Sequence, residues 1–220
     1  VLEIGERAGV PVNISHLKVT GLKNHGWGIE RAVGVLEEAR GRGQDVTADA
    51  YPYPGGSTTI LSLIPPTVME RAKGEAAAYL GTQEGIRDLA QEIGKEFSSW
   101  DNMVSSIGWE RIVIGSVIRE EDRIYAGLDF TAAAALSGST ETELFCRLVH
   151  ENSGKIGVIL MSMAQADVDR VLCLPYVSLI SDALYGGGGM PHPRLYGAFP
   201  KFLREYAGEK SALSFAEAVR

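Results

Sequence analysis

Apolar positions recur with two different periods along the first 57 residues, and each period predicts one kind of element. Residues 10–14 and 45–51 are short runs containing Val, Ile and Ala, which indicates two strands. Between them, apolar residues recur at helical spacing over 29–39. A strand–helix–strand unit of this length favours parallel pairing, because its crossover suits a right-handed βαβ connection. The pattern therefore predicts an α/β fold.

Residues 58–155 do not keep that rhythm, whereas the residues after them do. In the middle stretch the pattern predicts helices at 67–80, 84–97, 130–136 and 141–151, a loop at 100–109 and a strand at 111–117. This stretch is interpreted as a mostly helical insertion, because strand–helix connections need far fewer than its ~100 residues. The βα rhythm then returns with strands at 155–160 and 176–181 and helices at 165–172, 195–206 and 214–220.

Composition and charge exclude several classes of protein. The 220 residues carry 21 basic and 28 acidic side chains, a net charge of -7, so no nucleic-acid partner is expected. No apolar run approaches the ~18–20 residues of a membrane span, so no membrane partner is expected either. Cys146 and Cys173 lack CxxC spacing, which favours a reducing, cytoplasmic compartment. The chain opens on Val1 without a signal peptide, and we expect upstream sequence to be missing.

Two strand ends carry the candidate chemistry. Asp182 follows the apolar run at 176–180 and precedes four glycines, 186–189, which are interpreted as a mobile lid. His16 follows the strand at 10–14 in the same way. Because α/β enzymes place their chemistry at the carboxyl ends of buried strands, we expect these two ends to face each other across one site.

Four motifs, in this order, carry a resemblance to a known family. They are Ile-Ser-His-Leu-Lys at 14–18, Asp-Ala-Tyr-Pro-Tyr at 49–53 with Ser-Thr at 57–58, Ile-Ser-Asp at 180–182, and His-Pro-Arg-Leu-Tyr-Gly-Ala-Phe-Pro at 192–200. Together they resemble the N-acyl-D-amino-acid deacylases, or D-aminoacylases, of the amidohydrolase superfamily. Members of that superfamily are metal-dependent hydrolases built on a TIM barrel.

The resemblance implies only part of a (β/α)8 TIM barrel, strands six to eight. The corresponding divisions are a barrel segment at 1–57, the insertion at 58–155 and a second barrel segment at 156–220. The family carries a His-x-His pair, a bridging cysteine and a further histidine upstream of strand six. The histidines here, which are His16, His25, His150 and His192, match none of these positions. The chain is therefore expected to be a fragment.

The resemblance also assigns roles to the two strand-end residues. His16 is similar to the family's strand-six zinc ligand, and Asp182 to the strand-eight aspartate that binds metal and acts as general acid and base. Alternative readings are a hydrogen-bonded surface histidine and a turn or capping aspartate. Because zinc needs three or four protein ligands, the zinc site is expected to be incomplete in this chain.

Five further residues are candidates for substrate binding. Lys18 and Tyr51 resemble residues that hold the substrate's carboxylate and acyl carbonyl, and Ser57 occupies a similar binding position. His192 and Arg194 flank the glycine loop and are candidate substrate contacts, although the prolines around His192 favour a structural reason equally. A solvated lysine and a core tyrosine are the alternatives for Lys18 and Tyr51.

One position departs from the family. Family members that bind the substrate's α-carboxylate use an arginine six residues after the serine, where this chain has Leu63. An apolar side chain does not replace a bidentate guanidinium. Either Arg71 or Arg119 serves instead, or the substrate lacks that carboxylate.

Three hypotheses about function follow. The first is a metal-dependent amidohydrolase that deacylates N-acyl-D-amino acids, small-molecule substrates, with metal-activated water. The second, motivated by Leu63, is a dihydroorotase-like cyclic amidohydrolase. The third is a non-catalytic, inactive fragment that self-associates or pairs with the missing half through exposed strand edges.

Overall fold

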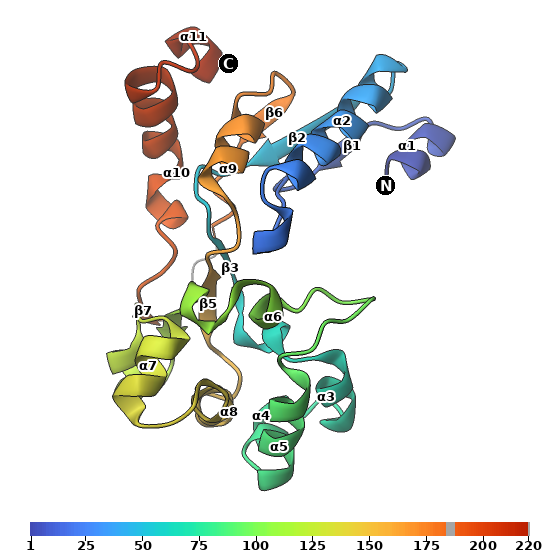
Figure 1. Ribbon diagram of the computed structural model, residues 1–220. Helices are drawn as coiled ribbons and strands as arrows, with labels where there is room; N and C mark the ends of the chain where they lie inside the picture. The colour runs from blue at the N-terminus through green and yellow to red at the C-terminus, as the bar shows by residue number, and fades with distance from the viewer. Residues whose placement is uncertain (184–187, 220) are drawn as a thin grey trace. The chain divides into compact units, whose positions relative to one another are not determined.

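The computed structural model describes residues 1–183 and 188–219, which form two compact units. Unit 1 comprises 1–54, 163–184 and 193–220, and unit 2 comprises 55–162 and 185–192, apart from the residues outside the described ranges. Figure 1 shows the order of the elements along the chain. None of the described helices has the length and apolar character needed to cross a lipid bilayer.

Unit 1 is built on a three-stranded parallel sheet. Strand β1 (Val12–Ile14) pairs with β2 (Val46–Ala50), and β2 pairs with β6 (Val177–Leu179), so the order is β1-β2-β6. Helix α2 (Trp27–Gly41) connects the first two strands, and α9 (Gln165–Leu172) precedes β6. The predicted α/β unit with parallel pairing is confirmed.

Alternation along β2 gives the sheet two different faces. Val46, Ala48 and Ala50 are buried, and they lie on the side of the sheet that packs on the helices. Thr47 and Asp49 point to the other face, which is polar and accessible. The buried face continues into a core with Ile29, Val33, Leu36 and Ala39 of α2 and Val168, Val171 and Leu172 of α9.

The remaining elements of unit 1 lie at the two ends of the chain. Helix α1 (Leu2–Ala8) ends at Gly9, whose φ of 66° suits a left-handed cap that only glycine adopts without strain. At the other end, α10 (Arg194–Phe202) runs into a π-helix (Leu203–Glu209) and then α11 (Phe215–Ala218). The helix predicted at 195–206 therefore forms, with a changed hydrogen-bond pattern in its second half.

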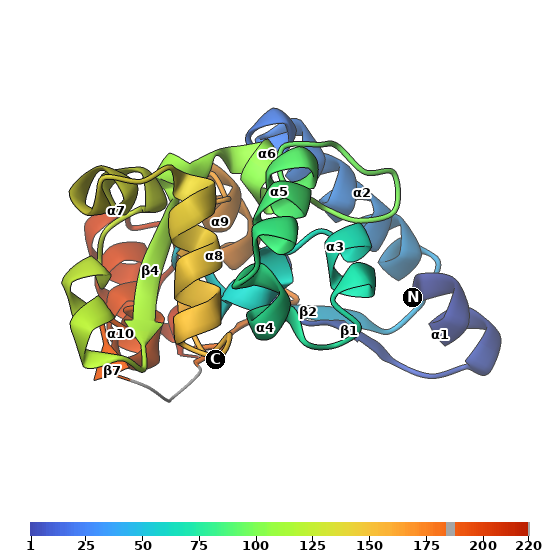
Figure 2. The ribbon, with the colours of Figure 1, turned by 90° about the horizontal axis from the view of Figure 1, so that it is seen from below.

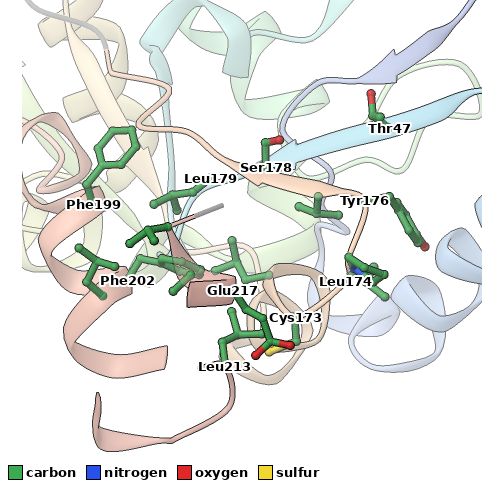
Figure 3. A pocket seen from close by; sticks show the side chains of 16 residues that line it. Thr47, Cys173, Leu174, Tyr176, Ser178, Leu179, Phe199, Phe202, Leu213 and Glu217 are labelled. Carbon is green, nitrogen blue, oxygen red and sulfur yellow. The ribbon is translucent and has the colours of Figure 1, made fainter. Parts of the chain in front are cut away.

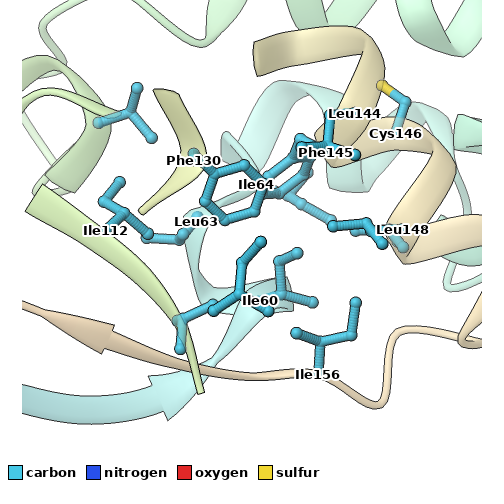
Figure 4. Packing of buried hydrophobic residues seen from close by; sticks show 14 of the residues in the cluster. Ile60, Leu63, Ile64, Ile112, Phe130, Leu144, Phe145, Cys146, Leu148 and Ile156 are labelled. Carbon is cyan, nitrogen blue, oxygen red and sulfur yellow. The ribbon is translucent and has the colours of Figure 1, made fainter. Parts of the chain in front are cut away.

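Unit 2 contains an antiparallel sheet of order β3-β5-β4-β7, which comprises β3 (Gly56–Thr59), β5 (Gly157–Leu160), β4 (Ile112–Val117) and β7 (Gly188–Gly189). Its helices are α3 (Pro66–Arg71), α4 (Ala76–Leu80), α5 (Gln83–Glu92), α6 (Met103–Ile107), α7 (Phe130–Ser137) and α8 (Glu141–Glu151). Helices α4 and α5 pack against α8 (Figures 1 and 2). Buried Leu, Ile and Phe side chains fill the interior (Figure 4).

Short 3-10 helices complete the two units. They are η1 (Leu22–Asn24) in unit 1, and η2 (Ile60–Leu63), η3 (Trp109–Arg111) and η4 (Glu120–Tyr125) in unit 2. The helices predicted at 141–151 and 165–172 coincide with α8 and α9, and the strand predicted at 111–117 is β4.

Several predictions about elements need correction. The helix predicted at 67–80 forms as α3 and α4 with a break between them, and the one predicted at 84–97 ends at Glu92. The strand at 155–160 forms as β5, but it pairs antiparallel with β3 and β4 instead of continuing the βα rhythm of the parallel strands. The region predicted as a loop at 100–109 contains α6, a helix of 5 residues whose Asn102 cap accepts from the amide of Ser105. A single turn is too short to show a helical period. Of the glycines interpreted as a lid, Gly186 and Gly187 lie outside the described residues.

Candidate functional site

His16 lies in a turn directly after β1. Its side chain is exposed, and its backbone has a φ of 42°, the left-handed region that a residue with a Cβ enters at a cost of ~1–3 kcal/mol. Its amide donates to Asp49 Oδ1 at 2.5 Å, and the amide of Leu17 donates to the Asp49 carbonyl at 2.8 Å. Two consecutive amides of the turn are therefore bound by one residue of β2.

Asp182 lies three residues beyond β6 and also adopts a left-handed conformation, with a φ of 47°. The amide of Ile180 still donates to the Ala50 carbonyl at 2.9 Å, so the chain stays attached to β2 nearly as far as Asp182. The Asp182 carboxylate is 2.7 Å from Nη1 of Arg194, whose side chain is only 3% exposed. Burial of that guanidinium is tolerable because a carboxylate balances its charge.

Tyr51 follows β2 and lies beneath two cations. Its ring is buried, with the Arg194 Cζ 4.6 Å and the Lys18 Nζ 5.7 Å from the ring centroid. Cations at these distances are attracted by the negative face of an aromatic ring. Lys18, Tyr51, Asp182 and Arg194 form one cluster in unit 1, which we call the Tyr51 cluster.

Burial shifts the pKa of two members of the Tyr51 cluster, Tyr51 and Lys18. Burial raises the pKa of Tyr51 to about 12, against the opposing charge of Arg194 and with the help of Asp182. Burial also lowers the pKa of Lys18, and the neighbouring Asp182 carboxylate opposes that shift. At neutral pH Tyr51 is therefore a phenol, which donates a hydrogen bond rather than carrying charge.

These groups are suited to binding an anion and moving a proton beside it. A guanidinium and an ammonium bind carboxylates through charge-assisted hydrogen bonds, and a phenol donates to a carbonyl or oxyanion. The Asp182 carboxylate beside them can accept and return a proton. Lys18, which follows β1, and Asp182, which follows β6, are linked within this cluster through Tyr51 and Arg194.

His16 and Asp182 are the candidate zinc ligands of the chain. Within residues 1–183 and 188–219, no group of three His, Cys, Asp or Glu side chains is placed to hold a metal ion. His16 and Asp182 supply an imidazole and a carboxylate, which are donors that zinc accepts, but zinc needs at least three protein ligands. The described residues therefore do not make a zinc site by themselves.

Ser57 and His192 belong to unit 2 rather than to the unit that carries the Tyr51 cluster. Ser57 lies in β3, opposite Ile159 of β5. The ring of His192 is 6% exposed, and its Nε2 donates to the Gly55 carbonyl at 2.8 Å. That bond supports the structural reason that the flanking prolines favour, and substrate contact by His192 stays a proposal.

Arg71 and Arg119, the alternatives to an arginine at position 63, both lie in unit 2. Leu63 is fully buried in the core of unit 2 (Figure 4). Arg71 is 2.9 Å from Asp88, and Arg119 is 2.5 Å from Glu151. Both guanidiniums are therefore engaged in ion pairs within unit 2, whereas Arg194 stands beside Tyr51.

Sequence reasoning missed Asp49. The residue lies within the quoted motif at 49–53, but no role was assigned to it. Its carboxylate accepts from the amide of His16, from Nδ2 of Asn13 at 2.9 Å and from Oγ of Ser15 at 3.5 Å. Alternation along β2 is the signal that points to it, because a carboxylate there shares the accessible face with Thr47.

A cavity of about 640 Å³ lies elsewhere in unit 1, between β6 and helices α9, α10 and α11. Figure 3 shows Phe199 and Phe202 at one side of it and Leu174 and Tyr176 at the other. Polar and apolar atoms contribute about equally to the lining, which includes none of the residues of the Tyr51 cluster. Its one charged side chain, Glu217, is engaged in capping α11 through Ser214. The cavity therefore offers no catalytic pair.

No protein-family model matches the chain. Among solved structures, the chain is similar to amidohydrolases. A D-aminoacylase that defines a novel subset of that class aligns over 99% of this chain and 35% of its own, with a TM-score of 0.65 and 26% identity. An N-acyl-D-glutamate deacylase from Bordetella bronchiseptica, complexed with zinc and a phosphonate mimic of the tetrahedral intermediate, covers the same shares with a TM-score of 0.68 and 25% identity.

The curated relatives of the chain are also deacylases of N-acyl-D-amino acids by name. The D-aminoacylase of Alcaligenes xylosoxydans xylosoxydans is 28% identical over 216 residues, which is 98% of this chain and 34% of the relative. The N-acyl-D-glutamate deacylase of the same organism is 26% identical over 220 residues, 100% of this chain and 35% of the relative. The resemblance to N-acyl-D-amino-acid deacylases is thus confirmed along the whole chain. The chain spans about a third of the length of these relatives.

Proposed function

We propose that the whole protein is a metal-dependent amide hydrolase that deacylates N-acyl-D-amino acids, and that this chain supplies part of its active site. The observation that carries the proposal is the Tyr51 cluster, a phenol between two cations and a carboxylate at the carboxyl ends of β1, β2 and β6. Similarity to deacylases along the full chain supports it. In this proposal the three parallel strands are strands six to eight of a (β/α)8 barrel.

The substrate is held through its charged end. Lys18 and Arg194 bind the carboxylate of the N-acyl amino acid, and the Tyr51 hydroxyl donates to the acyl oxygen, where negative charge develops during attack. Arg194 provides the guanidinium that Leu63 cannot provide. Ser57 and His192 stay proposals for substrate contact from the sequence resemblance.

Asp182 moves the proton. Its carboxylate takes a proton from the attacking water and returns it to the leaving amine nitrogen, which keeps the amine from departing as an anion. Zinc, when bound, lowers the pKa of water and polarises the acyl carbonyl. His16 and Asp182 are the ligands this chain contributes, and the remaining ligands come from outside the described residues.

The test is Asp182→Asn in the whole protein. The variant is expected to lose ~10²–10⁴-fold in turnover of an N-acyl-D-amino acid, because its amide cannot accept the proton. Asp45→Asn is the matched control, since Asp45 is exposed and precedes the amino end of β2. Zinc content is measured on each protein. Unchanged turnover in Asp182→Asn would exclude this role for Asp182.

A second candidate function is ring opening of a cyclic amide, as in dihydroorotase-like enzymes. The buried Leu63 favours it, because the family's carboxylate-binding arginine is absent. A substrate panel separates the two. Ring opening without hydrolysis of any N-acyl-D-amino acid would favour the cyclic amidohydrolase. Hydrolysis of an N-acyl-D-amino acid without ring opening would favour the deacylase.

A further inference from the structure

The turn that carries His16 holds a strained conformation. A histidine at φ 42° persists only where neighbouring groups fix it, because the left-handed region is unfavourable for side chains with a Cβ. The described contacts that fix the His16 turn come from Asp49 and Lys18. Asp49 binds two successive amides, and Lys18 Nζ donates to the His16 carbonyl at 3.3 Å.

The Asp49 carboxylate is itself oriented by a relay across the two strands. Thr47 Oγ1 donates to Asn13 Oδ1 at 2.9 Å, which turns the amide nitrogen of Asn13 toward Asp49. Asn13 Nδ2 then donates to Asp49 Oδ2 at 2.9 Å, and Oδ1 remains directed at the His16 amide. Asn13 lies directly opposite Thr47 in the β1–β2 register, so the relay follows from the pairing of the strands.

We propose that Asp49 is a positioning residue that holds the His16 turn, and thereby the His16 imidazole, in the conformation that binds zinc. This inference rests on the proposed function, in which His16 is a zinc ligand. Groups that orient metal ligands typically change metal affinity by 10–100-fold when they are removed. Asp49 acts through the backbone of the ligand instead of through its ring.

The test compares variants of the whole protein. Asp49→Ala removes the acceptor of the His16 amide and is expected to weaken zinc binding about 10–100-fold in chelator competition. It is also expected to lower kcat while KM stays within about twofold, because substrate-binding groups are untouched. In the metal-free protein, hydrogen exchange of the His16 amide should become faster, since the amide loses its partner.

Two further variants separate positioning from general disruption of β2. Thr47→Ser changes a residue on the same face of the same strand but keeps the hydroxyl that donates to Asn13, and it is expected to leave zinc affinity within about threefold. The exchange Asn13→Asp with Asp49→Asn reverses the polarity of the relay and keeps the net charge. It retains an oxygen facing the His16 amide, and it is expected to recover most of the zinc affinity lost in Asp49→Ala.

Wild-type zinc affinity and wild-type exchange of the His16 amide in Asp49→Ala would overturn the proposal. Equal losses in Thr47→Ser and Asp49→Ala would overturn it as well, because they would show disruption of the strand. Failure of the proposed function looks different: the wild-type protein would neither bind zinc nor hydrolyse an N-acyl-D-amino acid. In that case the exchange of the His16 amide still decides whether Asp49 holds the turn.

Discussion

Arg194 shows how one buried charge can link folding to binding. Its side chain is 3% exposed, and its guanidinium lies 2.7 Å from Asp182 and over the ring of Tyr51. A charge so buried needs a permanent partner or an incoming anion, because desolvation without compensation is costly. A substrate carboxylate is an anion of the right kind, so Arg194 is the cation we expect to distinguish charged from neutral substrates.

This expectation is tested by Arg194→Met. A charge-assisted hydrogen bond contributes ~1.5–3 kcal/mol, which corresponds to a rise in KM of about 10–100-fold for an N-acyl-D-amino acid. The corresponding N-acyl amino-acid amide lacks the carboxylate and serves as the matched substrate, with a KM expected to change by less than about threefold. Equal changes for both substrates would show that Arg194 supports the fold rather than the carboxylate.

Single residues also mark the limit of reading the sequence. Lys18, Tyr51, Asp182 and Arg194 were candidates because motifs and residue types point to them, and the structure brings them together. Asp49 was not predicted as a functional residue, because its carboxylate binds the backbone amide of His16. A backbone contact of this kind cannot be inferred from the types of the residues. His192 was a candidate by chemistry, but its Nε2 is engaged by the Gly55 carbonyl.

At the scale of elements, local periodicity predicted what is local. Helices α8 and α9 begin and end as the apolar spacing indicates, because that spacing reports which face of one helix is buried. Strand β5 has four residues, and its apolar pattern says nothing about its neighbours. It pairs with β3 and β4 through contacts between distant segments, which no local pattern contains. The parallel pairing could be predicted from the sequence only because a crossover helix lies between the paired strands along the chain.

Helix α9 is attached to the π-helix through Asp169, and this attachment has a defined pH dependence. Burial acts to raise the pKa of Asp169, but hydrogen bonds from Lys210, Tyr206 and Gln165 outweigh it and lower the pKa below its usual value. Because the folded-state pKa is lowered, the stabilisation is complete above the unfolded pKa and is lost as pH falls through the folded one. The attachment therefore weakens in acid.

The corresponding variant is Asp169→Asn. At pH 7 the free energy of unfolding is expected to fall by about 2 kcal/mol, the contribution of hydrogen bonds to a charged group. The difference from wild type should shrink as pH is lowered below ~3.9, the ordinary pKa of an aspartate. Denaturant unfolding across pH measures it, with Asp45→Asn as an exposed control. A difference independent of pH would contradict the linkage.

At the scale of the whole molecule, each unit has a buried apolar core and an open sheet within the described residues. Unit 2 encloses a large apolar core, with Phe130, Phe145 and Leu144 fully buried. In unit 1, β1 and β6 are the edge strands of the parallel sheet within the described residues, as β3 and β7 are those of the antiparallel sheet in unit 2. Parallel sheets are ordinarily covered and closed by neighbouring elements. The sequence alone indicated this only through the resemblance, since an edge is a property of assembled strands.

Each edge of that sheet adjoins a cavity, and the one beside β1 is apolar. The cavity of about 640 Å³ flanks β6, and a second of about 550 Å³ beside β1 is lined by apolar residues that include Leu2, Ile14 and Leu17. Unpaired strand edges beside apolar surface are templates for association with another chain. The 220-residue chain, produced by itself, is therefore expected to self-associate in a concentration-dependent manner, which sedimentation velocity measures. It is also expected to be inactive, because its described residues supply fewer ligands than zinc requires.

A charge placed on the edge strand β6 distinguishes association through that edge from non-specific association. Ser178 is exposed in β6, and Ser178→Lys should shift the chain toward monomer, because a lysine on an edge strand opposes pairing. Ser98→Lys introduces the same charge at an exposed position of unit 2 and should leave association unchanged. Equal effects of the two variants would attribute association to net charge. A wild-type chain that stays monomeric at every concentration would show that the strand edges are already protected.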